Sequence, residues 1–179
     1  EDVLPRHIGH EQRSVTLLEA VCQRLRVPND CRELALLVAR EHGNIHRSTE
    51  FGAAALTRLV VRCDALRKPE RFAQAIQACE ADARGRLGFE DRDYPQTGRL
   101  MAARDAAASI DAGAIAKACA DKVELIKDRV HQARVAAVAQ RLGLSEYGRP
   151  ATRSSRSPVP PATTGSSTRM AARIPCRTA

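Results

Sequence analysis

Histidines are the residues best suited to chemistry in this chain, and four of its five lie in two groups. His7 and His10 lie near the amino-terminal end, while His42 and His46 lie four residues apart further along. On a helix, residues with that spacing face the same side. Neutral imidazoles so placed can bind a divalent metal ion or a phosphate group. The spacing therefore indicates a candidate metal or phosphate site.

The segment around His42 does not match the metalloprotease signature. That signature requires Glu directly after the first His, and Gly43 stands at this position. The alternative interpretation is that these histidines are polar groups at the surface or at helix ends. Spacing alone leaves both interpretations open.

Helices must position these histidines, because the composition favours them. Aromatic residues make up 3% of the chain and Trp is absent, so Ala, Leu and Val must fill the core. No segment alternates apolar and polar residues over five positions, which argues against a sheet. We predict an all-α, multi-helix array. Apolar spacing places its helices at about 11–25, 30–46, 50–66, 69–84, 96–109 and 122–142, with a short one after Asp111.

Capping signals set the expected helix starts. Asp30 with Glu33 resembles a capping box, and Ser48 or Thr49 can cap the third helix. Pro69 suits the first turn of the fourth helix. The expected buried faces are Leu18, Val21, Cys22 and Leu25 on the first helix, Leu34, Leu37 and Val38 on the second, Phe72, Ile76 and Cys79 on the fourth, and Val123, Ile126, Val130, Ala133 and Ala137 on the last.

Positive charge is concentrated at the carboxy-terminal end. The net charge is +8, but residues 151–179 contain five Arg and no acidic residue, which leaves +3 for the remainder. From residue 149 onward Ser, Thr, Pro and Arg dominate, and apolar periodicity stops. Such a segment cannot bury enough surface to offset its chain entropy. We predict a disordered basic tail over 149–179, which could add weak, salt-sensitive RNA affinity.

Several classes of protein do not fit the sequence. The six cysteines form no CxxC pair, which argues against a zinc ribbon and favours buried free thiols in a reducing cytoplasm. No run of 18 apolar residues suggests a membrane span. The chain opens with Glu1-Asp2 and has neither a signal peptide nor an initiator Met, so we expect it to start inside a longer protein.

Five collinear segments carry a family resemblance over about 135 residues. They are LPRHIGHE (4–11), QRLRVPND (23–30), LVAREHGNIH (37–46), ALRKP (65–69) and EADARGRLGFEDRDYPQ (80–96). Together they resemble the bacterial CCA-adding tRNA nucleotidyltransferases that also carry an HD phosphohydrolase domain. The resemblance implies the carboxy-terminal, helical part of such an enzyme. It divides the chain into 1–48 (the carboxy-terminal part of the HD phosphohydrolase domain), 49–148 (the helical tRNA-binding body and tail region) and 149–179 (the disordered basic tail).

The resemblance assigns roles to two histidines. His42 matches a histidine needed for the HD phosphohydrolase activities, and His10 matches one beside the metal, so both are candidate catalytic residues and metal ligands of an incomplete site. The family uses Ni²⁺ or a similar ion at the HD site and Mg²⁺ for nucleotidyl transfer. The His-Asp pair and the nucleotidyltransferase head are both absent from this chain. We therefore expect that the chain alone is inactive and binds no metal stably.

The resemblance also implies RNA contacts. The family adds or repairs the 3′-terminal CCA of tRNA with CTP and ATP, which bind to the missing head, and grips the acceptor and TΨC arms with its helical region. Few aromatic residues are present, which argues against a reader of single strands. Solvated helix faces or internal salt bridges are the alternative for each basic group. The candidate tRNA-binding residues are Arg67, Lys68 and Arg71, then Arg84 and Arg86, and finally Lys127, Arg134 and Arg141.

Two other interpretations remain. One is a catalytically inactive helical module that binds RNA or acts as an adaptor. The other, a small standalone HD phosphohydrolase, is disfavoured by the missing His-Asp pair. A cytoplasmic location is expected for the enzyme. Whether it forms a homodimer is left open.

Overall fold

The fold is built from helices alone within the residues that the computed structural model describes, 9–120 and 122–145, where no strand occurs. The all-α prediction is therefore confirmed. The predicted tail 149–179 and His7 lie outside the described residues. In chain order the elements are α1 (His10–Arg24), α2 (Asn29–His46), the 3₁₀ helix η1 (Ser48–Glu50), α3 (Ala53–Arg62), α4 (Pro69–Arg84), α5 (Gln96–Ala108), α6 (Ala112–Ala118), the 3₁₀ helix η2 (Val123–Leu125) and α7 (Ile126–Leu142).

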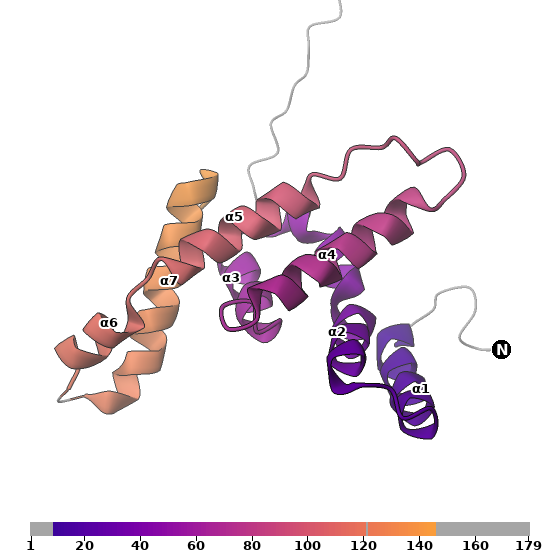
Figure 1. The fold of residues 1–179 in the computed structure, drawn as a ribbon. Coiled ribbons are helices and arrows are strands. Elements are labelled where there is room, and N and C mark those ends of the chain that lie inside the picture. Colours follow the sequence, from indigo (N-terminus) through magenta and orange to yellow (C-terminus); the bar gives the residue numbers. More distant parts are fainter. Residues whose placement is uncertain (1–8, 121, 146–179) are drawn as a thin grey trace, which may run out of the picture.

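The helices pack as a chain of neighbours. α1 packs against α2, which packs against α4, while α3, α5 and α7 pack against one another and α6 lies on α7. Figure 1 shows α1 and α2 at one end of the molecule and α6 and α7 at the other, with α4 and α5 between them. The long connection between α4 and α5 extends outward beyond the helices (Figure 1).

One hydrophobic core joins most of these helices. It includes Leu37 and Ile45 of α2, so the core continues across the predicted domain boundary at 48/49, and that boundary stays a prediction. Alanines with no exposed surface, such as Ala103, let helices approach closely. The largest fully buried side chains are Phe72, Ile45, Leu56, Leu59, Ile76 and Leu100, in agreement with the predicted face of α4.

The predicted helix starts were correct in part. Pro69 is the first residue of α4, and the Asp111 carboxylate accepts a hydrogen bond from the Ala114 amide, as expected. The capping box at Asp30 is wrong, because α2 already starts at Asn29 after Pro28, and no side chain caps it.

The predicted third helix, 50–66, is too long at both ends. Residues 48–50 form η1, and α3 begins only after Gly52, because the extended backbone at Phe51 interrupts the helix. The helix stops at Arg62, and Asp64 then takes a left-handed conformation (φ 55°). Asp tolerates this region better than most residues, because its side chain can bond to the local backbone.

Two predicted apolar faces are only partly buried. On α1 Cys22 is buried, but Val21 and Leu25 are 39% and 62% exposed. At the start of the last helix Val123 is 69% exposed, because it lies in η2 rather than in α7. Val130 is buried as predicted, and the other buried residues of α7 are Val135, Val138 and Ala139.

Side chains at the start of α5 donate hydrogen bonds to backbone carbonyls at the end of α2 and in the segment after it. Gln96 Nε2 donates to the His46 carbonyl at 2.8 Å. Arg99 Nε donates to the Ser48 carbonyl, and its Nη2 donates to the Phe51 carbonyl at 2.8 Å. The last carbonyls of a helix have no partner within it. The start of α5 therefore fixes where α2 ends and how η1 leaves it.

A second polar contact joins α2 to α3. The Glu41 side chain is 8% exposed and accepts two hydrogen bonds from the Arg62 guanidinium, at 2.6 and 2.8 Å. Burial alone would raise the pKa of Glu41, but the bonds from Arg62 and Asn44 outweigh it and hold that pKa below its usual value. The ionised pair thus orients α2 against α3.

The described cysteines are free thiols, and three of them, Cys22, Cys63 and Cys79, are buried as expected. Burial raises the pKa of Cys63 to about 12 and that of Cys79 to about 11, so neither is a nucleophile at neutral pH. No helix among the described residues is long and apolar enough to cross a membrane.

Candidate functional site

Two histidines from different helices meet where α1 and α2 pack together. His10 is the first residue of α1, and His42 lies in the last turns of α2. Their Nε2 atoms are 3.1 Å apart, and their ring centroids are 5.2 Å apart. Gly43 lies in the same contact, where a Cβ would be 3.4 Å from Glu11 Oε1. The structure thus brings together the two histidines that the sequence singled out.

Backbone carbonyls orient the His42 ring. Its Nδ1 lies 3.2 Å from the Val38 carbonyl oxygen and 3.3 Å from that of Ala39. Because a carbonyl only accepts, Nδ1 carries the proton in these hydrogen bonds. In the neutral ring, His42 Nε2 is then the acceptor nitrogen, and it faces His10. This is the tautomer that a metal-binding or proton-accepting imidazole requires.

A third histidine extends the pair. The rings of His42 and His46 are 6.3 Å apart, which confirms that residues at this spacing share one face of α2. On its far side His46 Nδ1 lies 3.0 Å from the Tyr94 hydroxyl, and Asp82 Oδ2 lies 3.4 Å from its Nε2. A row of rings therefore runs from His10 through His42 and His46 to Tyr94.

The environment of His46 keeps it neutral near pH 7. Burial lowers the pKa of His46, and this effect outweighs the opposing attraction of Asp82; the charges of His42 and Arg86 lower the pKa further. Burial also raises the pKa of the Tyr94 hydroxyl, as do Cys79, Glu80 and Asp82 nearby. The contact between the two rings is thus a hydrogen bond between neutral groups.

A hollow of about 790 Å³ lies beside His46, which forms part of its wall. It is enclosed by the end of α2, η1, the end of α4 and the connection from α4 to α5; we call it the loop pocket. Arg84, Arg86 and Arg92 line it, with Asp93 as the single acidic residue of the lining. The structure therefore places two of the predicted RNA-binding arginines at a concave surface next to the histidines.

The arginines of the loop pocket have few firm partners. Arg84 Nη2 lies 2.9 Å from Glu80 Oε1 within α4, so the predicted salt-bridge alternative holds for this residue. Arg86 is 69% exposed, and its Nη2 lies 3.6 Å from Asp82 Oδ2. The guanidinium of Arg92 lies over the Phe89 ring, 5.1 Å from its centroid.

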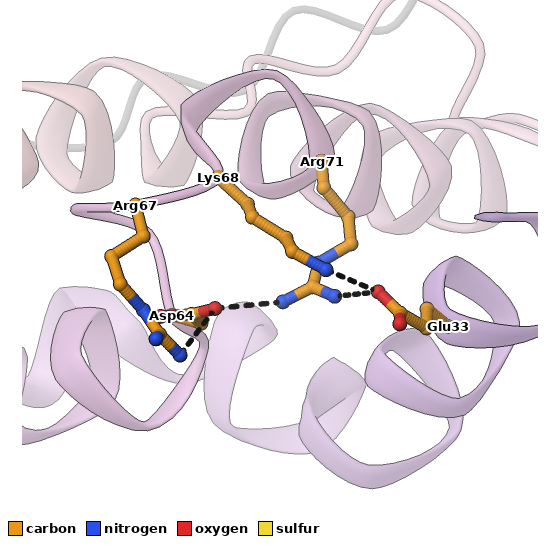
Figure 2. A network of polar contacts seen from close by, with 5 residues as sticks. All are labelled: Glu33, Asp64, Arg67, Lys68 and Arg71. Carbon is orange, nitrogen blue, oxygen red and sulfur yellow. Dashed lines mark hydrogen bonds and ion pairs between the residues drawn. The ribbon is translucent and has the colours of Figure 1, made fainter.

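The group at Arg67, Lys68 and Arg71 is placed differently, as Figure 2 shows. Lys68 Nζ lies 2.6 Å from Glu33 Oε2, and Arg71 contacts the same oxygen as well as Asp64. Arg67 pairs with Asp64 at 2.6 Å. The five residues form one network, which we call the α2–α4 junction. Its cations are matched by carboxylates from α2 and from the end of α3.

The third predicted basic group lies on α7. Lys127 and Arg141 are exposed, whereas Arg134 is half-buried and its Nε is buried without a hydrogen bond among the described residues. None of the three lines the loop pocket. The structure therefore separates this group from the histidines.

Several residues of the site were missed in the sequence. Arg92, Tyr94 and Gln96 come close to His46 although 46 to 50 positions separate them from it along the chain. They belong to the segment 80–96, the most distinctive of the five matching segments. Its chemistry pointed to RNA contact, but nothing in its local pattern showed that it folds back onto α2.

The histidine pair suits a divalent metal only as part of a site. Two imidazole nitrogens that face each other at 3.1 Å are suitable ligands, and the His42 tautomer leaves Nε2 available. Within residues 9–120 and 122–145 no group of three or more His, Cys, Asp or Glu side chains is arranged to hold a metal. The residues fit two positions of a metal site and not the whole of one.

Several known proteins similar to this chain share one name. A multifunctional CCA protein from Cupriavidus metallidurans is 86% identical over 146 residues, which are 82% of this chain and 35% of the relative. Proteins of the same name from Cupriavidus taiwanensis (78% identical, 80% of this chain, 34% of the relative) and Ralstonia nicotianae (68% identical, 78% of this chain, 32% of the relative) are also similar. No family model and no solved structure matches the chain. The chain spans about a third of the length of these relatives.

Proposed function

Because this chain belongs to the multifunctional CCA protein family, we propose that it is the helical part of a tRNA nucleotidyltransferase with a second, phosphohydrolase activity. The whole protein adds or repairs the 3′-terminal CCA of tRNA from CTP and ATP, with Mg²⁺ at a head that these residues do not include. Its second activity hydrolyses 2′,3′-cyclic nucleotides and 2′-phosphates at an HD site. It acts in the cytoplasm.

The convergence of His10 and His42 carries the proposal. These residues come from separate helices, and their Nε2 atoms face each other at 3.1 Å. The remaining ligands of an HD site then come from outside the described residues, in keeping with a partial set in this chain.

The residues of this chain contribute orientation and proton handling. The carbonyls of Val38 and Ala39 hold the His42 ring so that Nε2 faces His10, where it would be directed at a bound metal ion or phosphate. His10 contributes the opposing imidazole. A divalent ion such as Ni²⁺ bound there would polarise a phosphoryl oxygen and lower the pKa of bound water.

The proposed tRNA contacts differ in strength between the basic groups. Arg86, Lys127 and Arg141 are exposed, which supports direct phosphate contact, and Arg84 has to share its charge with Glu80. Arg134 is half-buried. The cations of the α2–α4 junction, Arg67, Lys68 and Arg71, are already paired with Glu33 and Asp64. Any contact with RNA would therefore be made without breaking these ion pairs. The division into an HD part (1–48) and an RNA-binding part (49–148) remains part of this proposal.

The test uses the full-length multifunctional CCA protein from Cupriavidus metallidurans, with the counterpart of His42 changed to Ala. Hydrolysis of a 2′,3′-cyclic nucleotide with Ni²⁺ should fall at least about 100-fold, since a group that positions metal or protons is lost. CCA addition to tRNA should persist, because its chemistry takes place in the head.

The matched control is the counterpart of His131, a histidine on α7 away from the pair, changed to Ala. This variant should keep both activities. If the His42 variant retains cyclic-nucleotide hydrolysis, the histidine pair is not catalytic. The 179-residue chain alone should show no turnover with Ni²⁺ or Mg²⁺, and clear turnover would contradict the partial-site proposal.

A further inference from the structure

The loop pocket has the size and lining of a site for one small anionic ligand. Its volume of about 790 Å³ lies within the range of small-molecule sites. Three arginines line it, with Asp93 as the one carboxylate of the lining. Arg84 is paired with Glu80 and Arg86 lies 3.6 Å from Asp82, so Arg92 and the mostly exposed Arg86 are the cations most available to a ligand. Such cations at a concave surface attract anions, and guanidinium groups bind phosphate oxygens in pairs. The charge of the lining therefore favours a phosphate group.

Two buried polar atoms of the wall have no hydrogen bond among the described residues. One is His46 Nε2, which has only Asp82 Oδ2 nearby, at 3.4 Å. The other is Gln96 Oε1, whose amide nitrogen is already used by the His46 carbonyl. Buried polar atoms without partners are uncommon and costly. Gln96 Oε1 is buried, so it would accept a hydrogen bond from a ligand hydroxyl or amino group once the side chain turns toward the hollow.

Aromatic rings complete the lining. Phe89 is 39% exposed, and the Arg92 guanidinium lies over one face of its ring, 5.1 Å from the centroid, which leaves the other face for stacking. Tyr94 lines the same hollow with its hydroxyl fixed on His46. Stacking of a base on an aromatic ring contributes affinity whichever base is present. Inorganic phosphate would use the arginines but leave Phe89 and Gln96 unused.

We infer that the loop pocket binds a single nucleotide, with its phosphate against Arg86 and Arg92 and its base against Phe89. Beyond the general RNA contact proposed for Arg84 and Arg86, this assigns a defined ligand to a site that also includes Arg92, Phe89 and Gln96. The inference rests on the proposed function in one respect only, namely that the bound nucleotide is part of an RNA.

The position of the pocket gives the nucleotide a role. His46 is shared between the pocket wall and the row of rings that leads to His42, 6.3 Å away. A nucleotide in the pocket therefore lies beside the histidine pair rather than on a remote surface. The pocket would hold the nucleotide next to the phosphate that the pair acts on.

The experiment measures binding of adenosine 5′-monophosphate to the 179-residue chain by calorimetry, and by NMR of the His46 ring. One nucleotide should bind per chain and shift the His46 ring signals. Arg86→Ala and Arg92→Ala should each weaken binding about tenfold through a lost charged hydrogen bond. Phe89→Ala should weaken it at least about fivefold through lost stacking.

The matched control is Arg58→Ala, which removes the same charge from an exposed position on α3 outside the pocket. Its affinity for the nucleotide should be unchanged. Adenosine and inorganic phosphate should each bind more weakly than the nucleotide. Equal binding of phosphate and nucleotide, with no effect of Phe89→Ala, would reduce the pocket to a site for any anion. Absence of binding would overturn the inference.

Competition with tRNA distinguishes the source of the nucleotide. If tRNA displaces adenosine 5′-monophosphate, the pocket takes a nucleotide of an RNA chain; if both bind together, it takes a free nucleotide. The proposed function fails separately, when the His42 variant of the full-length relative keeps its phosphohydrolase activity. If the nucleotide binds but the His42 variant keeps its activity, only the proposed HD site is contradicted. If no nucleotide binds but the His42 variant loses its activity, only the nucleotide pocket is contradicted.

Discussion

The α2–α4 junction and the loop pocket use the same residue types in opposite ways. At the junction Lys68 and Arg71 both contact Glu33, and the Arg71 side chain is only 18% exposed (Figure 2). In the loop pocket Arg86 is 69% exposed and has one acidic group 3.6 Å away. The first group holds helices together, whereas the charge of the second is only weakly paired and remains available to a ligand.

A cluster of arginines in a sequence is therefore not yet a cluster of available charge. The carboxylate that satisfies the junction, Glu33, lies 35 residues before Lys68 and 38 before Arg71. Only the packing of α2 on α4 brings them together. Whether a basic group binds RNA thus depends on acidic residues that are far away along the chain.

The largest expected effect on stability is at the junction. Arg71→Ala removes contacts with both Glu33 and Asp64 and should lower the free energy of unfolding by about 2 kcal/mol. For a chain of this length the thermal midpoint should fall by about 4–8 °C in circular dichroism. Arg58→Ala is the control and should leave the midpoint unchanged. A loss below about 0.5 kcal/mol would mean that the junction is not structural.

The acid side of the stability profile gives a smaller effect. Hydrogen bonds and charge from Lys68 and Arg71 hold the pKa of Glu33 below 4.5, and Arg67 does the same for Asp64 relative to 3.8. Folded carboxylates then bind fewer protons than unfolded ones, so this stability is present above the unfolded pKa and is lost as pH falls through the folded pKa. Urea unfolding at pH 7 and pH 3 should show a smaller acid loss for Glu33→Gln than for the native chain. Equal losses would exclude Glu33 as a contributor.

The smallest effect on stability is expected in the loop pocket. Arg86→Ala should change the free energy of unfolding by less than about 0.5 kcal/mol, because the side chain is mostly exposed. Its tRNA affinity should fall, and the slope of log affinity against log salt should decrease by about 1. Filter binding at several salt concentrations measures both. Lost stability with intact affinity would instead make Arg86 a structural residue, like Arg71.

Local signals predicted much of the fold. Pro69 and Asp111 marked helix starts correctly, since each acts on its own backbone. The third helix was misjudged because its limits depend on tertiary contacts. The carbonyls of Ser48 and Phe51 bond to Arg99, which lies far along the chain in α5.

The candidate site was predictable in unequal parts. Helical spacing placed His42 and His46 on one face of α2, and the structure confirms this. The approach of His10 to His42 followed from the family resemblance and not from spacing. Tyr94 and Arg92 could not be placed, because the connection between α4 and α5 has no periodicity that shows where it folds back.

The bonds from Gln96 and Arg99 to the end of α2 and the segment after it have a consequence for hydrogen exchange. Fifty residues separate Gln96 from His46, yet the His46 carbonyl, at the end of α2, is bonded by a side chain from the first turn of α5. We therefore expect the two turns to open together, so that their amides exchange at similar rates despite their distance along the chain. The end of α2 that carries the histidines should then open at the rate at which its contact with α5 opens, rather than at the rate of the rest of α2.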